Sequence, residues 1–296
     1  LVDEEPSPQR VQLLLGRGLA RARLRQRSEA QADIGAALAE AEACGDAAGF
    51  AHGVLVRGIA EELDDDFAAA VASYDEAVHR LDEVGDETRR AEALRHRGMA
   101  ELFLGENAKA GVSIAEALDA ARAGGDRATE AWALQNLAWI AYSRGDAEEA
   151  DHHLQASIQL FEEVGDRSGL GWALGLLAWV RFHQGRREEA ERLAERVMPD
   201  IDRRSDRWGQ GMMSLLIACA RLWSGRAAAA GEPAEEAARL FDEIGDRWGR
   251  VQAIAADGRA AVALGQVRRG MELFDRALAI ELSDSDHRGS AAIVGG

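Results

Sequence analysis

A spacing of 40 residues runs through most of the chain and constrains its fold more than any other feature. Aspartate recurs at this interval seven times, and a glycine or serine precedes it each time. These aspartates are Asp46, Asp86, Asp126, Asp166, Asp206, Asp246 and Asp286. A strict period of this length indicates an array of supersecondary units that stack on one another.

The glycine–aspartate pairs are predicted to mark helix boundaries. Glycine readily adopts the left-handed conformation that ends a helix, and the aspartate after it can cap the free N–H groups of the next helix. A second set of glycines lies half a period later, at Gly105, Gly145, Gly185, Gly225 and Gly265. Each unit is therefore predicted to be a hairpin of two helices, A and then B.

The segments between these boundaries have helical periodicity. In residues 131–139, AWALQNLAW, apolar side chains recur three and four positions apart, and the whole chain holds only four prolines. No segment shows the alternation typical of a strand, so the predicted fold is all-α. It is expected to be a single array of seven hairpins over residues 7–46, 47–86, 87–126, 127–166, 167–206, 207–246 and 247–286. Residues 287–296 are expected to begin a truncated eighth A helix.

Small residues are expected to set how closely the two helices of a hairpin approach. Gly18, Gly58 and Gly98 recur at one A-helix position, and bulky residues recur at one B-helix position. The bulky residues are Ile34, Tyr74, Ile114, Leu154 and Phe274. Pro199 and Pro233 predict a kink or a shortened helix in the fifth and sixth B helices, because each removes a backbone donor.

The combined pattern resembles the tetratricopeptide repeat (TPR). It is clearest in the fourth unit, at Leu134, Leu137, Ala138, Gly145, Asp146, Ala150, Leu154 and Ser157. The same skeleton covers about residues 7–286, although leucine replaces the family's usual tryptophan at position 134 and the repeat has 40 residues in place of about 34. This longer variety is similar to arrays in large bacterial regulatory proteins. The resemblance implies a right-handed α–α superhelix, a solenoid whose A helices form a concave wall.

The sequence shows no motif for catalysis, metals or cofactors. The single lysine, Lys109, is not part of a phosphate-binding loop, and no nucleophile elbow or HExxH helix occurs. Cys44 and Cys219 form no cysteine cluster, and Cys219 is expected to act as a small buried hydrophobe. We therefore expect a protein that is not an enzyme, with no cofactor and no metal site.

Charge and hydropathy narrow the range of partners. The formal net charge of −17 disfavours contact with nucleic acid and anionic membranes. No run approaches the roughly 20 apolar residues that span a bilayer. A cytoplasmic location is expected.

The resemblance places binding on the concave wall, where five of the seven tryptophans are expected in the central units. The predicted groove consists of Trp132, Gln135, Asn136, Trp139, Tyr142, Trp172, Trp179, Phe182, His183, Trp223 and Arg95. A large apolar patch of this kind is typical of a binding surface, and its polar members would orient the ligand. The alternative is that these rings pack against adjacent A helices as core. Trp208 and Trp248 are expected to pack in the joints between units.

The predicted function is a non-catalytic scaffold or sensor module of a larger bacterial regulatory protein. Its groove would hold a protein or peptide partner or a small apolar ligand. Two alternatives stay open: a module that forms homodimers, and the regulatory domain of an ATPase or cyclase whose catalytic part lies elsewhere.

Overall fold

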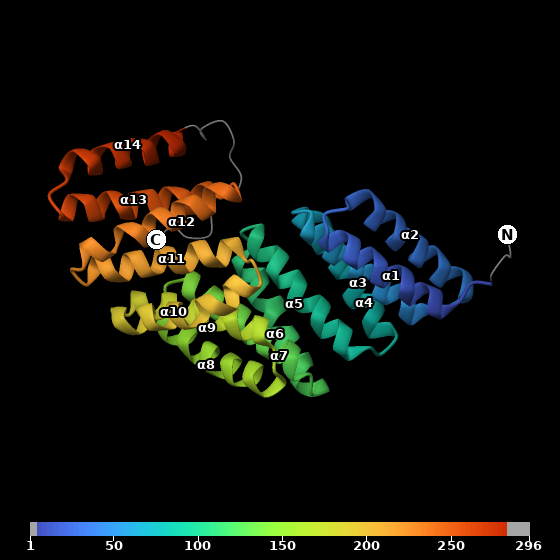
Figure 1. The fold of residues 1–296 in the computed structure, drawn as a ribbon. Helices are drawn as coiled ribbons and strands as arrows, with labels where there is room; N and C mark the ends of the chain where they lie inside the picture. The colour runs from blue at the N-terminus through green and yellow to red at the C-terminus, as the bar shows by residue number, and fades with distance from the viewer. Residues whose placement is uncertain (1–4, 283–296) are drawn as a thin grey trace. The chain divides into compact units, whose positions relative to one another are not determined.

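The computed structural model describes residues 5–282, which form fourteen α-helices, one 3-10 turn and no strand. The A helices are α1 (Pro8–Arg23), α3 (Ala47–Leu63), α5 (Glu87–Phe103), α7 (Arg127–Ser143), α9 (Arg167–His183), α11 (Arg207–Trp223) and α13 (Arg247–Ala263). The B helices are α2 (Arg27–Cys44), α4 (Phe67–Glu83), α6 (Asn107–Gly124), α8 (Ala147–Val164), α10 (Arg187–Arg203), α12 (Gly231–Glu243) and α14 (Val267–Leu282). The all-α solenoid of helical hairpins is therefore confirmed (Figure 1). The expected eighth helix lies outside the described residues.

The turns between helices repeat with a period of 20 residues. Within residues 5–282, every backbone φ in the left-handed region falls on this period, from position 25 to position 265, with values from 55° to 79°. Ten of these positions are glycine, as the sequence predicts. The other three are Arg25, Asp65 and Ser205, where the hairpin geometry imposes the conformation on a residue that adopts it less readily.

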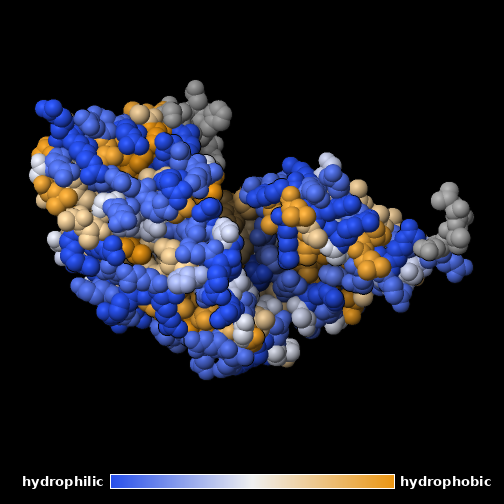
Figure 2. All heavy atoms as spheres, in the orientation of Figure 1, coloured by the Kyte–Doolittle hydropathy of each residue, from blue (hydrophilic) through white to orange (hydrophobic). Residues whose placement is uncertain are grey.

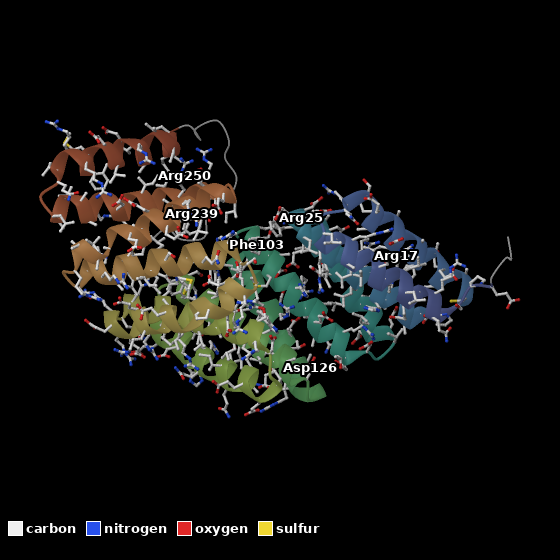
Figure 3. All side chains as sticks on the ribbon, viewed as in Figure 1. Arg17, Arg25, Phe103, Asp126, Arg239 and Arg250 are labelled. Carbon is white, nitrogen blue, oxygen red and sulfur yellow. The ribbon has the colours of Figure 1, made fainter. Side chains whose placement is uncertain are left out.

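The aspartates after these turns cap the following helix. Asp46 accepts a hydrogen bond from the Gly49 N–H at 2.8 Å, and Asp246 accepts one from Gly249 at 2.9 Å. Asp126, labelled in Figure 3, accepts from the Thr129 N–H at 3.1 Å at the start of α7. Each cap stabilises its helix by about 1 kcal/mol, which explains why the A helices begin at such regular positions.

The residues form two compact units, Leu1–Leu137 and Ala138–Gly296, with the boundary inside α7. The first unit contains α1 to α6 and most of α7, and the second contains the end of α7 and α8 to α14. That the hairpins form one array across this boundary stays a prediction.

Within each unit, small A-helix residues face large B-helix residues. A Cβ added at Gly58 would lie 2.6 Å from the ring of Tyr74, and one added at Gly98 would lie 2.4 Å from Ile114. Both bulky side chains are fully buried. The predicted small-to-large packing is therefore confirmed, and a larger A-helix residue would force the two helices apart.

Ion pairs add a polar link between paired helices. On α1, Arg17 (labelled in Figure 3) places its Nη2 2.6 Å from Oδ1 of Asp33 on α2, and Arg21 contacts the other carboxylate oxygen at 2.6 Å. Hydrogen bonds and charge from Arg17, together with Arg21, lower the pKa of Asp33 despite its burial. The buried carboxylate is therefore fully paired.

The two internal prolines have different effects. α10 keeps 17 residues although Pro199 lies inside it, so this helix is not shortened. In the sixth B segment, a 3-10 turn (Ala227–Ala229) replaces the first helical turn, and α12 has only 13 residues. Pro233 lies in the first turn of α12, where its missing N–H needs no partner within the helix.

The surface of both units is mainly hydrophilic in the view of Figure 2, with hydrophobic side chains in small groups. Of the helices in residues 5–282, none combines the length and apolar character needed to cross a membrane.

Candidate functional site

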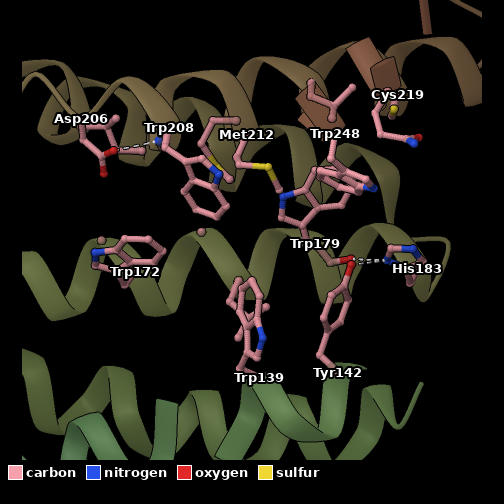
Figure 4. A pocket seen from close by; sticks show the side chains of 18 of the residues that line it. Trp139, Tyr142, Trp172, Trp179, His183, Asp206, Trp208, Met212, Cys219 and Trp248 are labelled. Carbon is pink, nitrogen blue, oxygen red and sulfur yellow. Dashed lines mark hydrogen bonds between the residues drawn. The ribbon is translucent and has the colours of Figure 1, made fainter. Parts of the chain in front are cut away.

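A pocket in the second unit gathers five of the seven tryptophans of the chain around a cavity of about 250 Å³. These are Trp139, Trp172, Trp179, Trp208 and Trp248. Trp139 lies on α7, Trp172 and Trp179 on α9, Trp208 on α11 and Trp248 on α13. Figure 4 shows their side chains around the pocket. We call this the aromatic pocket.

The 40-residue period explains why these side chains meet. Residues one period apart occupy the same level on successive A helices, so Trp139, Trp179, Cys219 and Arg259 form one row across the pocket. Trp208 and Trp248 form another row, from the first turns of α11 and α13. The pocket is thus built by repetition, with different side chains at equivalent backbone positions.

Two indole rings stack at one end of the pocket. The centroids of Trp172 and Trp208 lie 5.4 Å apart with an interplanar angle of 24°. Trp172 is 37% exposed and Trp248 is 36% exposed. Stacking of this kind contributes about 0.5–1.5 kcal/mol and fixes the rings while leaving part of their surface open.

Trp179 belongs partly to the pocket and partly to the core. Its ring lies 6.0 Å from that of Phe182 in an edge-on arrangement, and both pack against the buried core of the second unit. Its Nε1 is buried without a hydrogen-bond partner among the described residues. A buried donor that lacks an acceptor is costly, so this N–H is a point where a bound group could be stabilised.

His183 and Tyr142 form a short polar network at the other end. His183 Nδ1 lies 3.0 Å from the Trp179 carbonyl oxygen and 3.2 Å from the Tyr142 hydroxyl. Since a carbonyl only accepts, Nδ1 carries the proton and donates. Burial raises the pKa of Tyr142, so its phenol stays neutral.

Cys219 is half-buried in the same row. Burial raises the pKa of its thiol to about 11, against the opposing effect of the Arg259 charge. The thiol is therefore protonated at neutral pH, in agreement with the hydrophobic role predicted from sequence. In residues 5–282, no three His, Cys, Asp or Glu side chains are grouped so that they could hold a metal ion.

The predicted groove and the aromatic pocket overlap only in part. Of the predicted residues in the second unit, the pocket includes Trp139, Tyr142, Trp172, Trp179 and His183. Phe182 is half-buried, packs against the core of the second unit and does not line the pocket. Trp223 is 58% exposed and lies outside it.

Sequence reasoning missed Trp208 and Trp248. Both were expected to pack in the joints between units. Trp208 does pack against the core of the second unit, and both residues also line the pocket. The predicted groove left them out because it counted only one face of each A helix after the first turn, whereas these residues lie within the first turn. Trp208 and Trp248 are one 40-residue period apart, and Trp208 lies one helical turn before position 212, which is equivalent to the predicted wall position 172. This recurrence is the signal that could have found them.

The remaining predicted residues belong to the first unit and do not form an open groove there. Gln135 and Asn136 are each only 4% exposed, and Asn136 Nδ2 donates to Gln135 Oε1 at 2.9 Å. The prediction that they orient a ligand at an open edge is therefore wrong for the first unit as described. The Arg95 guanidinium lies 5.8 Å from the Trp132 ring centroid, in a cation–π contact.

Arg95 is also part of a polar network with His96 and Glu62. Its Nη2 lies 2.7 Å from His96 Nε2, while His96 Nδ1 lies 2.9 Å from Glu62 Oε2. The Tyr74 hydroxyl donates to the same carboxylate oxygen at 2.5 Å. Burial alone would raise the pKa of Glu62, but the contacts with His96, Tyr74 and Arg95 outweigh it and lower the pKa. This part of the first unit is filled by paired polar groups.

Comparisons with known proteins agree with this architecture. The family model described as tetratricopeptide repeat matches residues 89–163 and 140–199. No curated protein sequence gives a match to the chain.

Several solved structures share the fold at low sequence identity. The apo form of RapI is 12% identical, with a TM-score of 0.72 over 92% of this chain and 97% of that one. The Rap conjugation gene regulator of plasmid pLS20, solved with the Phr* peptide, is 13% identical, with a TM-score of 0.62 over 95% and 86%. A signal transduction ATPase with numerous domains and a tetratricopeptide repeat sensor, from Pyrococcus horikoshii, is 15% identical, with a TM-score of 0.69 over 93% of this chain and 42% of that one.

Fourteen helices in hairpins and a pocket built on successive A helices define a helical-repeat protein with a side-chain-lined recess. The matched family model and the structural neighbours make the assignment more specific. Residues 89–199 match the tetratricopeptide repeat, and the solved neighbours share the helical-repeat fold of the whole described chain.

Proposed function

We propose that this chain is a non-catalytic binding module that recognises a peptide or protein partner through the aromatic pocket. One observation carries the proposal: five of the seven tryptophans surround a single cavity, and two of them keep more than a third of their surface exposed. Tryptophan supplies much contact area at low entropic cost and is enriched at binding hot spots. The neighbour solved with the Phr* peptide supports a peptide as the ligand class.

The dimensions of the pocket favour a side chain as the bound group. Ligand cavities for whole drug-sized molecules have volumes of about 300–1,000 Å³, and this cavity has about 250 Å³. A bulky apolar side chain with part of its backbone would fill it. Such an anchor would remove the exposed faces of Trp172 and Trp248 from water.

A peptide-display selection tests this function. Twelve-residue peptides selected on the wild-type chain are measured by calorimetry against Trp172→Ala and Trp208→Ala. We expect affinity to fall at least tenfold in both, since each substitution removes a hot-spot ring. Trp223→Ala is the matched control, because Trp223 is exposed and lies outside the pocket. Equal affinity in all four proteins would refute the proposal.

We further propose that the module is the sensing part of a larger bacterial regulator in the cytoplasm. Support comes from the Pyrococcus horikoshii neighbour, whose repeats are described as a sensor and which this chain matches over 42% of its length. Because that neighbour is an ATPase, it also supports the alternative that the chain is a regulatory domain attached to an ATPase or cyclase. A full reading frame without any nucleotide-binding motif would contradict that alternative.

Self-association is a second candidate function, and α14 favours it. Val267, Met271, Leu278 and Leu282 lie on one helical face and are each more than half exposed. A homodimer could bury this stripe. Light scattering should then give twice the chain mass for the wild type and a single mass for Leu278→Glu, whereas a monomer at all concentrations would exclude the homodimer.

A further inference from the structure

The charged groups that line the aromatic pocket are mostly positive, although the chain as a whole carries −17. Arg204 and Arg259 line it, and Asp206 is the one carboxylate among its lining residues. Asp206 Oδ1 already accepts the Gly209 N–H at 2.9 Å as the cap of α11. The pocket therefore offers cationic donors and little free acceptor capacity.

Neither arginine has a carboxylate partner in residues 5–282, whereas most other arginines of the chain form ion pairs. Arg204 donates to the Ser168 hydroxyl at 2.8 Å, and no hydrogen bond is formed by the Arg259 side chain within the described residues. The unpaired Trp179 Nε1 adds a third donor. A ligand that complements this lining must supply acceptors and negative charge.

The two arginines lie at different levels along the A helices. Arg204 lies over Gly171, near the start of α9, where an added Cβ would come within 3.0 Å of its Nη2. Arg259 lies in the row of Trp179, eight residues further along the equivalent helix. Eight residues of helix rise about 12 Å along the axis, and α11 lies between α9 and α13, which adds roughly 16–20 Å across the helices. An extended segment of about six to seven residues spans this separation.

We propose that the aromatic pocket binds an extended acidic peptide segment whose central apolar side chain enters between the indoles, with one carboxylate on Arg204 and another on Arg259. This inference rests on the proposed function, because it assumes that the pocket is the peptide site. In this arrangement the Trp179 Nε1 donates to a backbone carbonyl of the peptide. Basic peptides of the same size are disfavoured, since they place ammonium groups against both arginines.

The test uses three blocked peptides with the cores Asp-Ala-Ala-Phe-Ala-Ala-Asp, Asn-Ala-Ala-Phe-Ala-Ala-Asn and Lys-Ala-Ala-Phe-Ala-Ala-Lys, titrated calorimetrically into the full chain. The acidic peptide should bind about tenfold more tightly than the neutral one, and the basic one most weakly. The ratio of the acidic to the neutral peptide's affinity should fall as the salt concentration rises, because both arginines are exposed and their charges are screened.

Two variants locate the charges. Arg204→Gln and Arg259→Gln should each weaken the acidic peptide by roughly threefold, so that the two effects together account for the tenfold preference, and leave the neutral peptide unchanged. Peptides with a single Asp-to-Asn change should each couple to only one arginine in a double-mutant cycle. Arg268→Gln is the matched control, since Arg268 is exposed and lies outside the pocket.

The outcomes distinguish the assignment of the charges from the assignment of the pocket as a peptide site. Equal binding of the acidic and neutral peptides, with loss in Trp208→Ala, overturns the charge assignment and keeps the peptide pocket. No measurable binding of any of the three peptides, together with a display selection that yields no Trp208-dependent peptide, overturns both.

Discussion

Equivalent positions in the two units hold opposite kinds of side chain. Arg95 and His96 on α5 correspond, 80 residues later, to Gly175 and Leu176 on α9. In the first unit a guanidinium and an imidazole fill the space and pair with Glu62. In the second, glycine and leucine leave it open and line the aromatic pocket. The repeat backbone sets where side chains meet, and the residues at those positions decide between a closed polar network and an open site.

The largest effect is expected from breaking the polar network. Glu62→Ala removes the acceptor of the buried Tyr74 hydroxyl and of His96 Nδ1, so the free energy of unfolding should fall by about 3 kcal/mol. Urea unfolding measures the change. The control Asp119→Ala, at an exposed position without such contacts, should change it by less than about 0.5 kcal/mol. Similar stability of the two variants would mean that the network contributes little.

Filling the open site should separate binding from stability. A Cβ added at Gly175 would meet Met213 at 3.6 Å, an ordinary contact, so Gly175→Leu can enter the cavity without backbone strain. Peptide affinity should fall more than tenfold, while stability stays constant or rises by about 0.5–1 kcal/mol because glycine is a poor helix former. Calorimetric titration and thermal unfolding report the two quantities. Retained affinity in a folded variant would place the ligand elsewhere.

Acid should weaken the first network through Glu62. Its pKa is below the usual 4.5 in the folded chain, so the unfolded chain takes up a proton at a higher pH than the folded one. The stability contributed by this carboxylate is therefore complete above about pH 4.5 and is lost as the pH falls through the folded pKa. Urea midpoints between pH 6 and 3 should fall less steeply for Glu62→Gln than for the wild type. Parallel curves would show that this carboxylate has no shifted pKa.

The smallest effect is expected at Cys219. With a thiol pKa of about 11, less than about 1% is thiolate at pH 8, so iodoacetamide should modify Cys219 slowly in the folded chain and quickly in urea. Mass spectrometry of the modified peptides follows the rate. Rapid modification of the folded protein would indicate an exposed, activated thiol.

Much of this fold could be predicted because its signals are local. Glycine before aspartate ends one helix and caps the next, and the small-to-large pairs such as Gly58 and Tyr74 recur at fixed spacing. The left-handed turns at Arg25 and Asp65 lack glycine, so only the period could predict them.

The site was harder to predict because it depends on packing between helices. A single helical face suggested that Asn136 is open, yet it is buried. It also suggested that Phe182 lines the groove, yet Phe182 packs against the core and lies outside the pocket. Trp208 reaches the pocket from the first turn of α11, outside the face that the pattern marks. Periodicity shows which residues share a level, whereas the direction of each ring follows from its neighbours.

We propose above all that a peptide binds in the aromatic pocket of the second unit. The most direct measurement is photocrosslinking of the acidic peptide with benzophenone in place of its phenylalanine, followed by mass spectrometry of the crosslinked fragments. If the peptide binds in the aromatic pocket, crosslinks form at the pocket residues of α9 and α11, between Trp172 and Met212, and disappear in Gly175→Leu. Crosslinks in the first unit, or crosslinks that persist in Gly175→Leu, would contradict this proposal.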